Sequence, residues 1–192
     1  MNKAVITTII ILLAVIGNSI AQTERKGPSL PGTVIIAEAL AGKLVSVDKD
    51  SFKRHSLDPE KAIDHFLFYY SANWSPNCRK FTPELIKFYT KAKKEGANFE
   101  VIFVSRDDTA KEMLGYMMEQ KMPWPAIRFE DLETLNFLKE VSGRGVPCLA
   151  VLDSRGLILA HSYQGGKKYL GPDPPLQEFK KLIGSKENEP KN

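Results

Sequence analysis

The feature that most constrains the fold is a buried strand followed closely by a long amphipathic helix. Residues 65–70, HFLFYY, form a compact apolar and aromatic run, which is typical of a β-strand covered on both faces. From Cys78 onward the apolar positions repeat with the period of a helix. The apolar face of this helix consists of Phe81, Leu85, Phe88, Tyr89 and Ala92. Pro83 lies inside the pattern and predicts a kink in the helix.

The other strands are predicted from shorter patterns. Residues 99–104, FEVIFV, have the composition of a second core strand. Residues 43–47 and 51–52 flank a turn and predict a strand pair. The segments 149–152 and 157–160 flank the turn DSRG and predict a β-hairpin.

Three further helices are expected. Asp108 can cap the first of them, whose predicted apolar face is Met113, Leu114, Met117 and Met118. A second, short helix is marked by Leu132, Leu135 and Leu138. Asp173 and Pro174 open the last one, whose inner face is Leu176, Phe179, Leu182 and Ile183. The order of elements predicts an α/β fold with a central mixed sheet, helices on both faces, and a C-terminal hairpin followed by a helix.

The N-terminus has the layout of a secretory signal peptide. A short positive segment containing Lys3 precedes the apolar run 4–16, and the small-residue pattern Ser19-Ile20-Ala21 follows it. The run is too short for a membrane span, which takes about 20 apolar residues. We therefore expect residues 1–21 to be removed, leaving no stable membrane span, and the protein to be exported to the periplasm or the extracellular space.

The rest of the chain is predicted to form one domain. Residues 22–41 are expected to be a flexible lead-in, residues 42–184 the folded domain, and residues 185–192 a polar tail. A formal net charge of +4 is too weak to indicate nucleic-acid binding. Cysteine and histidine do not cluster with metal-ligand spacing. No metal and no other cofactor is implied.

Several separated motifs resemble one family. Trp74-x-x-x-Cys78, Pro83 five positions later, and Gly145-Val146-Pro147 before the hairpin resemble the thioredoxin fold. The segments FYYSANWSPNCRKFTPEL, VIFVSRDD and MPWPAIRFED are similar to the tryparedoxin and nucleoredoxin branch. The resemblance covers roughly residues 42–184. It implies partners that are protein or peptide thiols and disulfides, or an extended peptide segment.

The resemblance also implies a groove beside a cis proline. Pro147 matches the family's cis-proline position, and X-Pro is the one common place for a cis bond. The expected groove is formed by Trp74, Pro76, Val146 and Pro147. Here an extended peptide could lie against apolar side chains and exposed backbone groups.

The sequence departs from the family at the reacting sulfur. The family carries Cys-x-x-Cys, in which the first thiolate attacks a disulfide and the second resolves the mixed disulfide. Ser75 holds the attacking position and Cys78 the resolving one. Two-thiol exchange at the helix is therefore excluded. If the protein is an enzyme, it is a thiol-dependent oxidoreductase that uses Cys78 as a single nucleophile, with Ser75 as a hydrogen-bond partner.

Four hypotheses for Cys78 remain open from the sequence. It could form a disulfide with Cys148, if the two α-carbons lie within about 7 Å. It could act as the cysteine of a one-Cys peroxidase of the peroxiredoxin type, with Arg79 or Arg144 as the assisting cation. The protein could instead be a non-catalytic binding module that kept only the groove. Cys78 would then be buried and inert, as resolving-position thiols often are.

Overall fold

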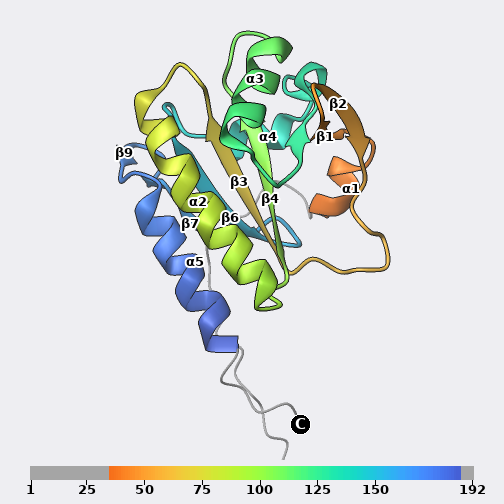
Figure 1. Ribbon diagram of the computed structural model, residues 1–192. Helices are drawn as coiled ribbons and strands as arrows, with labels where there is room; N and C mark the ends of the chain where they lie inside the picture. Colours follow the sequence, from red (N-terminus) through yellow and green to blue (C-terminus); the bar gives the residue numbers. More distant parts are fainter. Residues whose placement is uncertain (1–34, 187–192) are drawn as a thin grey trace, which may run out of the picture.

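The computed structural model describes residues 35–186, which fold around a seven-stranded mixed sheet (Figure 1). The strands are β1 (Leu44–Asp48), β2 (Ser51–His55), β3 (His65–Ser71), β4 (Phe99–Ser105), β5 (Ala126–Ile127), β6 (Cys148–Asp153) and β7 (Ile158–His161). Their order in the sheet is β2-β1-β5-β4-β3-β6-β7. β3 runs parallel to β4 and antiparallel to β6, so the centre of the sheet is mixed.

Helices cover both faces of this sheet, as the sequence predicts. The helices are α1 (Ile36–Leu40), α2 (Pro76–Lys94), α3 (Ala110–Gln120), α4 (Asn136–Val141) and α5 (Asp173–Lys186), with a 3-10 turn at Phe129–Asp131. α2, α3 and α5 contribute buried side chains to the core on one face of the sheet. α1 and α4 contribute to the core on the other face. Figure 1 shows α2 and α5 side by side in front of the sheet.

Strand β3 supplies both cores because successive side chains of a strand point to opposite faces. Leu67 and Tyr69 pack beneath α2 and α5, whereas Phe66, Phe68 and Tyr70 pack beneath α1 and α4. Every residue of the strand is buried. This is why the run lacks the polar alternation of a half-exposed strand.

The predicted lead-in is partly wrong, because its last residues are ordered. Residues 36–40 form α1, in which Ile36 and Leu40 are buried against the sheet. Two apolar side chains at helical spacing give this short segment a place in the core. At the other end, α5 extends to Lys186, two residues beyond the expected end of the domain.

The start and the inner face of α3 also differ from the expectation. Thr109, and not Asp108, is the N-cap, and its hydroxyl accepts a hydrogen bond from the N–H of Glu112 at 3.1 Å. Met118 is 39% exposed, and Tyr116 takes a buried position instead. Met113, Tyr116 and Met117 have the i, i+3, i+4 spacing of one helix face, and Tyr116 packs against Phe103 of the sheet, so the buried stripe includes an aromatic side chain that the apolar pattern did not select.

A small separate hairpin follows β7. β8 (Tyr163–Gln164) pairs antiparallel with β9 (Lys168–Tyr169), and the sequence patterns did not predict it. The backbone N–H of Leu170 donates to the carbonyl of Ser162, which ties the base of the hairpin to the end of the sheet. In Figure 1, β9 lies near the N-terminal end of α2.

The predicted signal peptide (1–21), most of the lead-in and residues 187–192 of the tail lie outside the described residues. Between residues 35 and 186, no helix combines the length and the apolar character that crossing a membrane requires.

Candidate functional site

The candidate site begins where β3 ends and α2 starts. Ser75 is the N-cap of α2, and its hydroxyl accepts a hydrogen bond from the backbone N–H of Cys78 at 3.4 Å. Pro76 follows at the first helical position, where its missing N–H costs nothing. The helix then continues through Pro83 to Lys94. The residue in the attacking position therefore serves as a helix cap.

Cys78 points into the core and not towards solvent. Its residue is 0% exposed, and it belongs to the apolar cluster beneath α2 and α5. A thiol reacts as the exposed thiolate. A partner cannot reach this sulfur unless the first turn of the helix moves.

Four buried hydroxyls hold this first turn in place. Thr82 Oγ1 lies 2.9 Å from the Cys78 carbonyl oxygen, 2.9 Å from the Tyr69 hydroxyl and 2.6 Å from the Tyr116 hydroxyl. Ser71 Oγ donates to Tyr69 and lies 3.0 Å from Tyr116. Every hydroxyl donates if Tyr116 donates to Ser71, Ser71 to Tyr69, Tyr69 to Thr82 and Thr82 to the Cys78 carbonyl, and the 2.6 Å contact between Thr82 and Tyr116 then carries no proton. Each hydroxyl then donates once.

Burial keeps both phenols of this network protonated. Desolvation raises the pKa of Tyr69 well above its ordinary value, and the neighbouring Tyr116 raises it further. Desolvation likewise raises the pKa of Tyr116. Sequence reasoning missed all four hydroxyls, although Tyr69 and Ser71 stand in the strand that it identified.

Trp74 is the exposed part of the site. Its residue is 61% exposed, and its indole Nε1 donates to the backbone carbonyl of Arg106 at 3.0 Å. The ring is therefore held in one orientation while most of its surface faces solvent. An aromatic ring with its polar atom already paired offers an apolar surface for binding.

Asp107 fixes the loop on which Trp74 stands. Its carboxylate accepts the Asn73 N–H at 2.7 Å and the Ser105 hydroxyl at 2.8 Å. Burial raises the pKa of Asp107, and these two hydrogen bonds oppose the rise. Asp107 belongs to the motif VSRDD, which indicated the family from the sequence. The motif did not predict the hydrogen bonds that Asp107 accepts from Asn73 and Ser105.

A shallow hollow lies beside Trp74. Its volume is about 410 Å³. It is lined by Asn73, Trp74, Arg79, Asp107, Glu112 and Glu119. The Arg79 guanidinium donates to the carbonyl of Asn73, and Arg144 is exposed on the loop before Pro147. Neither arginine is described in contact with the Cys78 sulfur, which a peroxidase of this type would require.

The other residues of the expected groove lie on the loop before β6. The peptide bond between Val146 and Pro147 is cis. Gly145 donates its N–H to the hydroxyl of Tyr163 at 2.7 Å, and Tyr169 donates its hydroxyl to the Pro147 carbonyl at 2.7 Å. Burial raises the pKa of Tyr169 to about 12, so this phenol is a proton donor at neutral pH.

Cys148 does not approach Cys78, and both thiols are free. Cys148 belongs to the core beneath α1 and α4, on the opposite face of the sheet from Cys78. The disulfide that the sequence left open is therefore absent, because strand alternation directs this side chain away from α2. Desolvation raises the pKa of Cys148 to about 11, and its sulfur lies 3.8 Å from His161 Nε2.

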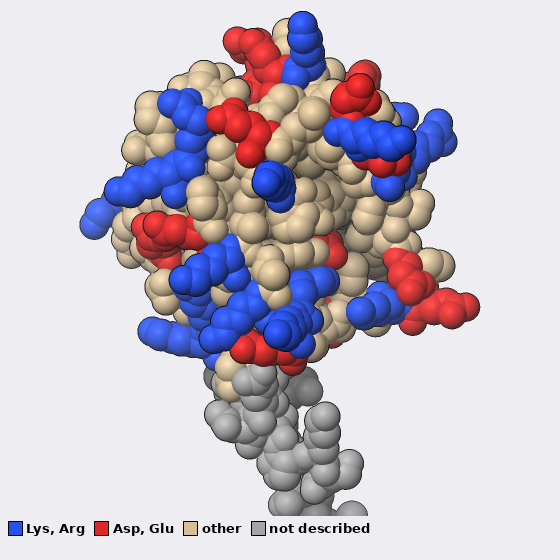
Figure 2. Space-filling model, viewed as in Figure 1, with Lys and Arg blue, Asp and Glu red and all other residues tan. Residues whose placement is uncertain are grey.

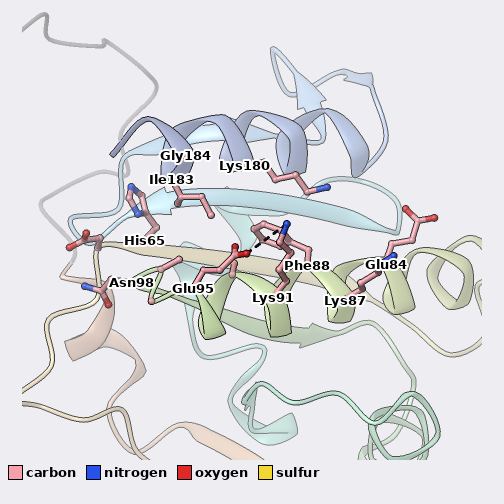
Figure 3. Close-up of a pocket in the computed structure, with 14 residues that line it drawn as sticks. His65, Glu84, Lys87, Phe88, Lys91, Glu95, Asn98, Lys180, Ile183 and Gly184 are labelled. Atoms are coloured by element: carbon pink, nitrogen blue, oxygen red, sulfur yellow. Dashed lines mark ion pairs between the residues drawn. The ribbon is translucent and has the colours of Figure 1, made fainter. Parts of the chain in front are cut away.

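A larger hollow lies further along α2 and contains none of the predicted site residues. It lies between α2 and α5, and its volume is about 930 Å³ (Figure 3). Its lining includes three lysines and two glutamates, namely Lys87, Lys91, Lys180, Glu84 and Glu95. Figure 2 shows basic groups interspersed with acidic ones over this face of the molecule. Within residues 35–186, histidine, cysteine and carboxylate side chains form no group that could hold a metal ion.

Comparison with known proteins identifies the family. A family model described as thioredoxin-like matches residues 64–158. Nucleoredoxin from Homo sapiens is 33% identical over 165 residues, which are 85% of this chain and 36% of that protein. Tryparedoxin I from Leishmania major has a TM-score of 0.52 and 30% identity, covering 64% of this chain and 81% of that one. The chain belongs to the nucleoredoxin and tryparedoxin branch of the thioredoxin-like proteins.

A further structure of this branch agrees. Tryparedoxin I from Crithidia fasciculata is 32% identical, with a TM-score of 0.52, and the match covers 66% of this chain and 85% of that one. The family and the fold expected from the motifs are therefore confirmed. Thioredoxin-like redox proteins act on protein thiols. This chain spans about a third of the length of the curated nucleoredoxins that it matches, 36% for the human protein.

Proposed function

We propose that this protein is a thioredoxin-like binding module that holds an extended peptide segment in the groove between Trp74 and the Val146–Pro147 loop, without thiol chemistry at Cys78. The observation that carries the proposal is a contrast in exposure: Cys78 is 0% exposed, whereas Trp74 is 61% exposed. The aromatic ring beside the start of α2 is open to a ligand, whereas the sulfur is covered.

The capping serine supports the absence of thiol exchange. Ser75 supplies a hydroxyl where the family has the attacking thiol, and a hydroxyl is not ionised near neutral pH as an activated cysteine is. The Ser75 side chain is itself buried and accepts from the Cys78 N–H. A disulfide substrate would meet neither an attacking nor a resolving thiolate at this position.

The free backbone of Val146 supports peptide binding. No hydrogen bond from its N–H or to its carbonyl is described, although both neighbouring residues are held by tyrosine hydroxyls. An extended segment can pair with such groups as an added strand. The exposed indole of Trp74 and the exposed ring of Pro76 would then contact its side chains.

We also propose that the protein acts outside the cytoplasm, in the periplasm or the extracellular space. The support is the charge and apolar pattern of residues 1–21 alone. N-terminal sequencing of the protein recovered from the cell envelope and the medium would test this. A new N-terminus at Gln22 is expected, and an intact Met1 on a cytoplasmic protein would contradict it.

The binding proposal is tested by selecting linear peptides from a phage-displayed library on the purified protein. We expect enriched peptides that bind the parent protein and the Cys78→Ala variant equally, and Trp74→Ala at least about tenfold more weakly. Unfolding curves of each variant show whether the fold is intact. Failure to enrich any peptide, or binding that ignores Trp74, would overturn the proposal. Loss of binding in a folded Cys78→Ala variant would show that the thiol is required.

A further inference from the structure

The loop that carries the cis proline is held from outside the main sheet. Its two contacts with the β8–β9 hairpin lie on either side of Val146: the Gly145 N–H donates to the Tyr163 hydroxyl, and the Tyr169 hydroxyl donates to the Pro147 carbonyl, each at 2.7 Å. Val146 lies between these two anchors, and no hydrogen bond is described for its own backbone N–H or carbonyl.

The two tyrosines form a unit. Their ring centroids are 5.0 Å apart, at an interplanar angle of 47°. Tyr163 is fixed at its own backbone, because its N–H donates to His161 Nδ1 at 3.0 Å. Tyr169 and Tyr163 belong to opposite strands of the hairpin and are paired in its register. The ring packing and the hairpin pairing therefore fix the positions of the Tyr163 and Tyr169 hydroxyls.

The packing of Tyr163 against the loop is close. A Cβ placed on Gly143 would lie 2.0 Å from Cε2 of the Tyr163 ring, so only glycine fits there. A Cβ on Gly145 would lie 3.2 Å from the Tyr163 hydroxyl oxygen. The approach of this ring explains the glycine at position 143 and leaves little room for a side chain at position 145.

Tyr169 reaches towards the site and keeps an open face. Its residue is 46% exposed. The Tyr169 hydroxyl is nevertheless committed to the Pro147 carbonyl, next to Val146 in the loop.

We propose that Tyr163 and Tyr169 are positioning residues, which hold the backbone of Val146 in the orientation that pairs with an extended peptide; this rests on the proposed binding function. The hydroxyls act through the loop, and no contact of theirs with the peptide is needed. The hairpin is then part of the binding machinery and more than a connection between β7 and α5.

The experiment uses a peptide selected on the parent protein and measures its affinity for Tyr163→Phe, Tyr169→Phe and the double variant. Each substitution removes one hydroxyl and keeps the ring. We expect each single substitution to weaken peptide binding about fivefold to tenfold. The affinity of the double variant should fall by no more than the two single fold-changes multiplied together. The matched control is Tyr89→Phe on α2, which removes a hydroxyl that donates to Glu100 at 2.8 Å.

The control separates positioning from general stability. Tyr89→Phe is expected to lower the unfolding temperature and to leave the affinity unchanged. If the parent binds peptide and the two hairpin variants bind equally well, the inference is wrong and the binding function stands. Should the hairpin variants lose no more affinity than Tyr89→Phe at equal loss of stability, the inference is again wrong. If no peptide binds the parent in a Trp74-dependent way, the binding function itself fails and the inference with it.

Discussion

Ser75 caps helix α2 by accepting a hydrogen bond from Cys78, the residue that would be its partner in dithiol exchange if position 75 held a cysteine. Its hydroxyl accepts the N–H of Cys78 at 3.4 Å, so the two ends of the Ser-x-x-Cys motif are joined by a capping bond and not by a disulfide. An N-cap serine contributes about 1 kcal/mol to the stability of its helix. The position that carries the attacking sulfur in the family thus has a structural role in this chain.

Replacing this cap by sulfur tests whether the scaffold still supports dithiol chemistry. Ser75→Cys places a thiol at the start of α2, where the helix dipole and free N–H groups favour the thiolate. We expect the variant to gain dithiothreitol-driven reduction of insulin, measured by turbidity, while the parent shows none above the uncatalysed rate. Ser75→Ala is the matched control for loss of the cap and should stay inactive. An inactive but folded Ser75→Cys variant would show that the groove no longer accepts a disulfide.

Burial of both cysteines predicts slow alkylation of the native protein. Cys78 and Cys148 are each 0% exposed, so iodoacetamide must wait for local opening. At pH 7.5 we expect both to react at least about 100-fold more slowly than a cysteine in an unstructured peptide. In 8 M urea, a denaturing condition, both should react fully. Peptide mapping by mass spectrometry distinguishes the two sites, and rapid native labelling of Cys78 would contradict its buried position.

The raised pKa of Cys148 predicts a loss of stability in alkali. Desolvation moves it from 9.0 to about 11, so above pH 9 the unfolded chain ionises this thiol while the folded chain keeps the proton. The folded state therefore loses stability as pH rises from 9 towards 11, by at most about 3 kcal/mol. Cys148→Ala should remove that part of the slope in urea unfolding curves measured at pH 7 to 11. Parallel slopes for parent and variant would show that the thiol does not contribute.

More of the fold than of the candidate site could be predicted from the sequence. The run at residues 65–70 and the helix after Cys78 were predictable because each is continuous in the chain and has a clear period. The hairpin at β8–β9 was not, since two-residue strands carry no periodicity. The same holds for the faces of the two cysteines: a one-residue difference in strand phase decides whether Cys148 meets Cys78.

The hydroxyl network could not be predicted either, because its members come from distant parts of the chain. Thr82 on α2 meets Tyr116 on α3, 34 positions away, and both meet side chains of β3. Each residue alone is an unremarkable core or helix position. Only the packing of three elements against one another turns them into a single polar cluster.

This network predicts a large cost for a small change. Thr82→Val keeps the shape of the side chain but removes the hydroxyl that lies within 2.9 Å of Tyr69, Tyr116 and the Cys78 carbonyl. Tyr69 and Tyr116 keep their bonds to Ser71 but lose those to Thr82, and loss of hydrogen bonds in a buried cluster costs about 1–3 kcal/mol. We expect the free energy of unfolding in urea to fall by that amount. Native alkylation of Cys78 should become faster, because the first turn of α2 loses its anchor.

A matched control is Thr134→Val, which removes one part-buried hydrogen bond from the hydroxyl of an exposed residue to the Asp131 carbonyl at 2.8 Å. Its cost should stay below about 1 kcal/mol, and the alkylation rate of Cys78 should not change. Equal losses in the two variants would mean that the buried hydroxyls act independently. A Thr82→Val protein of parental stability would mean that the first turn of α2 is held by the serine cap and the apolar packing alone.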